Sequence, residues 1–161
     1  MKPNDPKEDL YGYLKAAREA IIWKLEGLSE YDSRRPLTPT GTNILGLVKH
    51  LASVEFGYLG PTFGRPHNES LPWDEEGAEA NSDMWAPADE SREDILGLYH
   101  RAWAHADATI EELPLDAMGH VAWWGDNGDV TLQRINGRPG KTLGWETPAE
   151  RLSKLLATTR Q

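Results

Sequence analysis

The chain has 161 residues and a formal net charge of −9, and 27% of its residues are charged. Residues 1–134 hold 12 Lys and Arg against 24 Asp and Glu (net −12), whereas residues 135–161 hold 5 against 2 (net +3). Because an acidic body repels phosphate backbones, we expect no nucleic-acid binding by the main domain. The chain has no cysteine, so we also expect no disulfides and no thiolate ligands.

The length and hydropathy of the chain suit a single folded domain outside the membrane. No apolar run approaches the ~20 residues that span a bilayer. The N-terminal sequence MKPNDPKEDL lacks the apolar stretch of a secretory signal. We therefore expect a cytoplasmic protein.

The first predicted helix runs from Asp5 to Leu28. Asp5 is a good cap, and Pro6 suits the first helical position. Apolar residues recur along one face at spacings of three and four: Leu10, Leu14, Ala17, Ile21, Leu25 and Leu28. The following residues, 29–43, are rich in Pro, Ser, Thr and Gly and are expected to form a loop.

The second predicted helix begins after a cap at Thr42 or Asn43 and ends at Gly60-Pro61, a pair that cannot continue a helix. Its expected inward stripe is Ile44, Leu47, Val48, Leu51, Ala52, Glu55, Tyr58 and Leu59. A long irregular connection, residues 61–88, follows, and its aromatic residues are expected to hold it across the open end of the bundle.

The third predicted helix opens with a cap at Ser91 and stops at Pro114. No helix is compatible with residues 136–148, and a last short helix is predicted to begin at Thr147. Three long antiparallel helices need a fourth to close their core. The predicted fold is therefore all-α, an up-down helical bundle whose fourth helix is missing or replaced by a short C-terminal helix.

Five histidines are the first candidates for metal binding, but none is paired at the i, i+4 spacing that projects two imidazoles from one helix face. His50 lies at the border of the apolar stripe of the second helix, where a half-buried histidine bonded to a loop carbonyl is the alternative to a metal ligand. His105 has a similar border position on the third helix. His100 is expected to face solvent, and His120 lies in a connection.

Glu55 is unusual because helical phase places a carboxylate in the middle of an apolar stripe. Burying an unpaired carboxylate costs several kcal/mol or forces its protonation. Two interpretations stay open: a functional role for Glu55, or a salt bridge to an arginine such as Arg18.

Long segments of the chain resemble an actinobacterial DinB-like family. These segments are LGLVKHLASVEFGYLGPTFGRP, LPWDEEGAEANSDMWA and ESREDILGLYHRAWAHADATIEELPLDAMGHVAWWGD, and the similarity covers roughly residues 8–134. The resemblance implies a four-helix bundle. It also implies relatedness to transferases and isomerases that use a divalent metal (Zn or Ni) and a low-molecular-weight thiol such as mycothiol or bacillithiol.

By that resemblance, His50 in VKHLASVE matches the metal ligand of the second helix, and a fourth helix with an H-x-x-x-H pair should follow VTLQRI. The sequence departs there, since it has no histidine after His120. With one ligand fixed, Glu55 and His120 are the remaining weak candidates, and a tight site needs about three or four. The metal site is therefore expected to be incomplete, with reduced or no activity.

The C-terminal segment resembles a different family. The sequence INGRPGKTLGWETPAERLSKLLA is similar to the end of insertion-element transposases with an integrase-type core. We therefore divide the chain into a truncated DinB-like domain, residues 1–134, and a transposase-like tail, residues 135–161, joined as a chimera. The catalytic carboxylates of that second family are not expected in so short a tail.

Three functional hypotheses remain open at this stage. The first is a family member with an incomplete metal site. The second is an active metal-dependent thiol S-transferase whose ligands are completed by a second chain. DNA binding by the basic tail ranks lowest. An uncovered apolar bundle face also predicts either that the last helix folds back over it or that two chains meet there as a homodimer.

Overall fold

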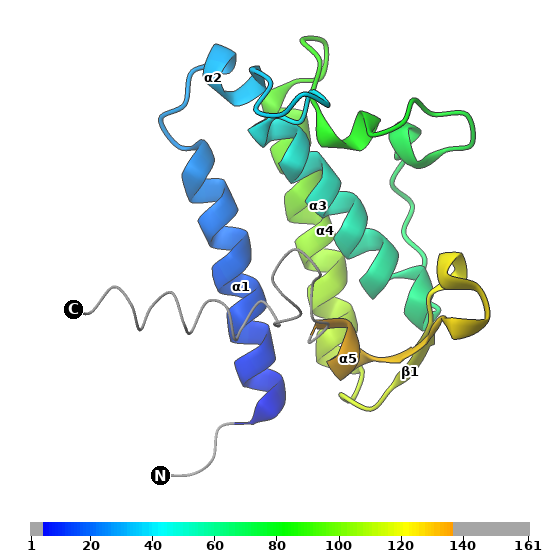
Figure 1. The fold of residues 1–161 in the computed structure, drawn as a ribbon. Helices are drawn as coiled ribbons and strands as arrows, with labels where there is room; N and C mark the ends of the chain where they lie inside the picture. The colour runs from blue at the N-terminus through cyan, green and yellow to red at the C-terminus, as the bar shows by residue number, and fades with distance from the viewer. Residues whose placement is uncertain (1–4, 137–161) are drawn as a thin grey trace.

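The structure is a computed structural model that describes residues 5–136, and it confirms the all-α bundle. Three long helices lie side by side: α1 (Pro6–Leu25), α3 (Ile44–Leu59) and α4 (Arg92–Glu112) (Figure 1). The pair α3 and α4 packs closely along its length, and α1 lies along one side of that pair (Figure 1).

Helix α1 begins as the sequence predicts and ends earlier. The side chain of Asp5 accepts a hydrogen bond from the backbone N–H of Lys7, and Pro6 is the first helical residue. The helix stops at Leu25 instead of Leu28, because Gly27 adopts a φ of +75° that a right-handed helix does not contain. The loop expected next contains a short helix, α2 (Glu30–Arg34), capped by Ser29.

Helix α3 begins at its predicted cap, where the side chain of Asn43 accepts from the backbone N–H of Gly46. Its buried face is only partly the predicted stripe. Val48, Ala52, Glu55 and Leu59 are buried as expected, whereas four members stay half-buried: Ile44, Leu47, Leu51 and Tyr58. The buried face also includes Leu45, Lys49 and Phe56, so it is rotated relative to the predicted stripe.

The connection between α3 and α4 is held against α3 by short 3-10 turns. These turns are η1 (Pro61–Phe63), η2 (Pro72–Asp74) and η3 (Ser82–Met84). The indole N–H of Trp73 donates to the hydroxyl of Ser53 on α3 at 2.8 Å. Trp73 therefore helps to fix this connection along α3, whereas the sequence analysis expects the aromatic residues to hold it across the open end of the bundle.

The segment after α4 contains a small sheet that the sequence analysis did not predict. Strands β1 (Met118–His120) and β2 (Asp129–Thr131) pair antiparallel, with Gly119 opposite Val130. A 3-10 segment, η4 (Ala122–Asn127), connects them, and a short helix, α5 (Leu132–Asn136), follows directly. Strands of three residues carry too little alternation to be recognised in a sequence.

The main hydrophobic core lies between α3 and α4, with contributions from the end of α1. Its buried members are Leu25, Leu45, Val48, Ala52, Phe56, Leu71, Ala86, Ile95, Leu98, Tyr99 and Ala102. A smaller cluster at the other end of the bundle joins Leu59, Ala106 and Leu132. Helix α5 thus closes the lower end of the bundle, and the described chain provides no fourth long helix.

Among residues 5–136, no helix has the length and apolar character needed to cross a membrane. The helix predicted to begin at Thr147 and nearly all of the transposase-like tail lie outside the described residues.

Candidate functional site

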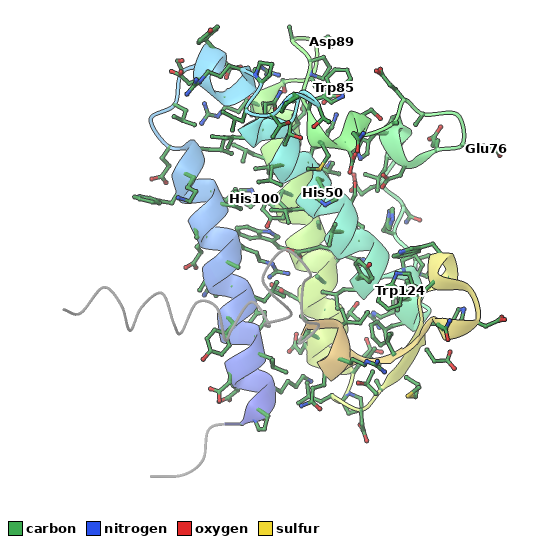
Figure 2. All side chains as sticks on the ribbon, viewed as in Figure 1. His50, Glu76, Trp85, Asp89, His100 and Trp124 are labelled. Atoms are coloured by element: carbon green, nitrogen blue, oxygen red, sulfur yellow. The ribbon has the colours of Figure 1, made fainter. Side chains whose placement is uncertain are left out.

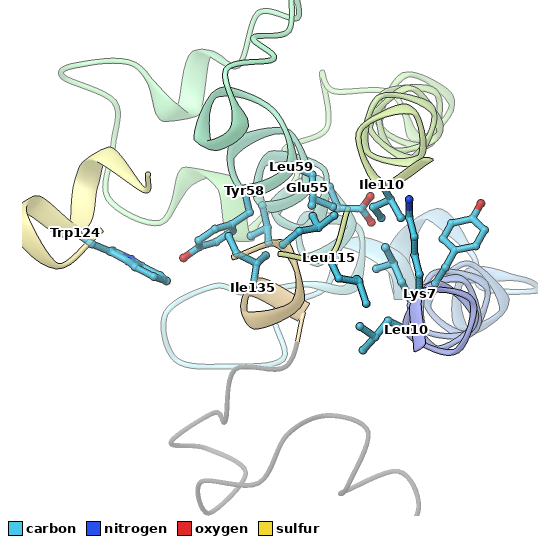
Figure 3. A pocket seen from close by; sticks show the side chains of 13 residues that line it. Lys7, Leu10, Glu55, Tyr58, Leu59, Ile110, Leu115, Trp124 and Ile135 are labelled. Atoms are coloured by element: carbon cyan, nitrogen blue, oxygen red, sulfur yellow. The ribbon is translucent and has the colours of Figure 1, made fainter. Parts of the chain in front are cut away.

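An apolar groove opens beside the three long helices. It has a volume of about 290 Å³ and lies between α1, α3, α4 and α5. Figure 3 shows Lys7 and Leu10 of α1 facing Leu115 and Ile135 across it. The residues that line it are Lys7, Leu10, Tyr11, Leu14, Val54, Glu55, Tyr58, Leu59, Ile110, Leu115, Trp124, Leu132 and Ile135.

A buried ion-pair network joins the three long helices beside this groove. The guanidinium of Arg18 on α1 donates to both carboxylate oxygens of Glu55 on α3, at 2.9 and 2.6 Å. It also donates to Asp107 on α4 at 2.6 Å, and the hydroxyl of Tyr11 donates to the other oxygen of Asp107 at 2.9 Å. Of the two interpretations of Glu55, the salt bridge to Arg18 is the arrangement that the structure contains.

The protonation behaviour of this network follows from its burial. Burial raises the pKa of Glu55 above its usual value, and the hydrogen bonds from Arg18 oppose that rise. The hydrogen bond to Asp107 and burial raise the pKa of Tyr11. Both oxygens of Glu55 accept from Arg18, so the carboxylate is paired within the bundle.

His50 lies on the first half of α3 (Figure 2), and an aspartate from the connection holds its side chain. Its Nδ1 lies 2.5 Å from Oδ2 of Asp83 in η3, and its side chain is 36% exposed. The alternative considered for His50 was a bond to a loop carbonyl, and the partner is instead a loop carboxylate. When Nδ1 carries the proton and donates it in the hydrogen bond to Asp83, Nε2 keeps a lone pair that can accept a hydrogen bond or bind a metal ion.

The other histidines do not converge on His50. Strand β1 packs on η1, beyond the end of α3, and there Nδ1 of His120 lies 2.9 Å from Asp129. His50 precedes Leu59, the last residue of α3, by nine positions, which is roughly 13 Å along the helix axis. Glu55 follows His50 by five positions and therefore projects roughly 140° away around the same helix.

His105 and His67 form a separate pair around Phe56. Nε2 of His105 lies 2.9 Å from the carbonyl oxygen of Arg65, so this residue is the half-buried histidine bonded to a loop carbonyl that the sequence favours. Burial and the nearby His105 lower the pKa of His67. His100 is exposed, as expected.

A comparison with known protein families finds one match. The model of the mycothiol-S-transferase family matches residues 9–137, which include α3, α4 and all of α1 except its first three residues. The chain belongs to the mycothiol-S-transferase family. No curated protein and no solved structure is detectably similar to it. The match to this DinB-like family supports the resemblance found in residues 8–134 and ends two residues after the start of the transposase-like segment.

In the described part of the chain, the donors present do not fit a divalent metal of the kind that the family resemblance implies. Within residues 5–136, no group of three or more His, Asp or Glu side chains could hold a metal ion. His50 has one acidic neighbour, Asp83, and the carboxylate of Glu55 is occupied by Arg18. Among the described residues, His50 is therefore not joined by the further donors that a closed site needs.

Two polar residues important to this family member were not found by sequence reasoning. Asp83 holds His50, and Lys49 is 1% exposed with its ammonium 2.8 Å from Glu90. The ammonium of Lys49 also lies 4.4 Å from the ring centre of Trp73. A lysine in the apolar segment LGLVKHLASV was a signal for a buried charge in need of a partner.

Proposed function

We propose that this chain is a mycothiol-S-transferase relative that does not perform metal-dependent thiol transfer on its own. One observation carries the proposal: in the part of the chain that the structure describes, Asp83 is the only acidic side chain bonded to His50, and the two supply too few donors for a catalytic metal. The sequence from residue 137 onward contains no His or Asp, so its donors are limited to Glu146 and Glu150.

Coordination chemistry explains why this shortage matters. Catalytic zinc sites use about three protein ligands and keep one position open for water or substrate. A thiol becomes a nucleophile at neutral pH when a metal or a cationic neighbour favours its thiolate. A lone imidazole provides neither the affinity nor the charge for that role. The apolar groove and the helical scaffold thus remain from the family without its chemistry.

Metal analysis of the full chain tests the proposal directly. The protein is purified without a histidine tag, dialysed against metal-free buffer and titrated with Zn²⁺ and Ni²⁺. We expect far less than one equivalent to remain bound, and no difference between the wild type, His50→Gln and the matched control His100→Gln. We also expect no transfer of mycothiol to an electrophilic acceptor above the uncatalysed rate. One equivalent of metal that only His50→Gln removes would overturn the proposal.

A second candidate function is favoured by the bond between His50 and Asp83. Metal-binding histidines commonly donate one ring N–H to a carboxylate, which orients the other nitrogen toward the metal. In this alternative, two chains meet and the second chain completes the ligand set, giving an active thiol S-transferase. Light scattering with and without Zn²⁺ distinguishes the two candidates, because only the second requires a zinc-dependent dimer that His50→Gln abolishes.

We further propose that the chain is a chimera produced when an insertion element interrupted a gene of this family. The support is the change of resemblance near residues 134–136 and the end of the family match at residue 137. Neighbouring genomic DNA tests this origin. Mobile-element sequence beginning at the codons for 135–161 is expected, and an uninterrupted gene without such sequence nearby would contradict it.

A further inference from the structure

The groove is open along the side of the bundle that the described chain leaves uncovered. Its walls are almost entirely apolar, and its single carboxylate, Glu55, is neutralised by Arg18. An apolar surface of this kind is stabilised when another apolar surface excludes water from it. The occupant must therefore present an apolar face.

The chain leaves its described part at the edge of this groove. Ile135 lines the groove, and the next residue, Asn136, is the last of α5. The sequence then continues for 25 residues, 137–161. In that stretch Leu152, Leu155 and Leu156 recur at helical spacing after a capping box at Thr147.

The charges beside the groove are opposite in sign to most of those in this segment. A shallow depression shares Lys7, Tyr11 and Ile110 with the groove and is bordered by four acidic residues: Asp5, Glu8, Asp107 and Glu111. The segment 147–161 supplies Arg151, Lys154 and Arg160. A second copy of the bundle would instead bring another strongly acidic surface, since residues 1–134 carry a net −12.

We propose that residues 147–158 of the same chain dock in the groove, with their leucines against its apolar walls and their basic residues beside its acidic border. This proposal is independent of the metal chemistry proposed above. The connecting residues, 137–146, span up to about 33 Å when extended, which exceeds the roughly 30 Å length of α1. A tether of this length favours the attached segment over a separate chain by raising its effective concentration.

An engineered disulfide tests the proposal in the full chain, which has no native cysteine. Leu10 lies in the groove wall, and Leu10→Cys is combined with Leu155→Cys under mild oxidation (Figure 3). The control pair is Ala16→Cys with Leu155→Cys, because Ala16 is exposed on α1 and does not line the groove. We expect an intramolecular disulfide in a monomer, at a rate about tenfold above the control. Equal rates, or a disulfide between two chains, would overturn the proposal.

A second pair of variants tests the docking without a covalent bond. Leu155→Asp places a charge on the apolar side of the predicted helix, and Ala157→Asp places the same charge on its opposite side. Circular dichroism establishes that both variants keep the bundle. We expect Leu155→Asp to increase the fluorescence of an added apolar dye severalfold and Ala157→Asp to leave it unchanged. Unchanged fluorescence in Leu155→Asp would contradict docking. Finding a ligand or a second copy of the chain in the groove would contradict it as well.

Discussion

Arg18 on α1 and Glu55 on α3 form a two-pronged ion pair in which both carboxylate oxygens accept from one guanidinium, and their side chains are 2% and 8% exposed. Such a pair holds two helices at a fixed distance and rotation. Burying the pair also costs the desolvation of both charges. Replacing one partner and replacing both partners should therefore change the stability by different amounts.

Arg18→Met is expected to lower the free energy of unfolding by about 3–5 kcal/mol, because it leaves the carboxylate of Glu55 buried without a partner. The double variant Arg18→Met with Glu55→Leu should recover most of that loss, since no buried unpaired charge remains and Asp107, the other partner of Arg18, is 35% exposed and keeps its hydrogen bond from Tyr11. Urea denaturation measures both. Arg101→Met, which breaks the exposed pair with Glu69, is the control and should cost less than about 1 kcal/mol. A double variant as unstable as Arg18→Met would contradict this explanation.

Gly46→Ala is expected to be strongly destabilising, because a Cβ at this position would overlap the backbone of Met84 and Trp85. Gly12→Ala on α1 is the matched control, since its Cβ meets no atom within 4 Å. Alanine is favoured over glycine in a helix by up to about 1 kcal/mol, so Gly12→Ala should stabilise the protein. Thermal unfolding followed by circular dichroism compares the two. An unchanged melting temperature for Gly46→Ala would show that the connection does not pack on α3 as described.

Lys49→Ala is expected to cost about 2–4 kcal/mol, a loss in the range of truncating a large buried side chain. It removes the aliphatic stem packed near Trp73 and the partner of Glu90. Lys49→Met keeps most of the packing volume, and Glu90 is 31% exposed and can be hydrated, so this variant should be closer to the wild type. Urea denaturation separates packing from charge. Equal losses in the two variants would mean that the ion pair dominates.

The pKa of His67 is lowered below the ordinary value of 6.5, mainly by burial and then by the nearby His105. The unfolded chain therefore binds this proton more readily than the folded one. The resulting stability is present above pH 6.5 and is lost as the pH falls below it toward the lowered pKa. His67→Gln should show a smaller loss of stability between neutral and mildly acidic pH. NMR titration of His67 checks the direction, and a midpoint above 6.5 would contradict it.

The sequence predicts the long helices because each carries a cap and a continuous apolar face. Asn43 and Ser91 begin α3 and α4 where expected, and Gly27 ends α1 three residues early because a single positive φ angle leaves little trace in helical periodicity. The hairpin around Gly119 was not predictable, since its position depends on contact with Phe63, which is distant in sequence.

The candidate site also contains features that the sequence predicts and features that it does not. Helical phase alone indicates that Glu55 is buried, and it suggests Arg18 as a partner because both lie on long helices. The bond from His50 to Asp83 joins positions 33 residues apart through an irregular connection, so no periodicity reports it. Lys49 was missed for a related reason: its partners, Glu90 and Trp73, come from that connection.

The attachment of α1 has a consequence for how the molecule opens. Only Arg18 and Leu25 of this helix are buried, and its remaining ties to α4 include hydrogen bonds from Lys7 to the carbonyl of Glu111 and from Arg92 to the carbonyl of Leu25. Charged contacts of this kind weaken in concentrated salt, whereas apolar packing between α3 and α4 does not. Amide exchange should therefore begin in α1, which would swing away as a unit while its two neighbours stay folded.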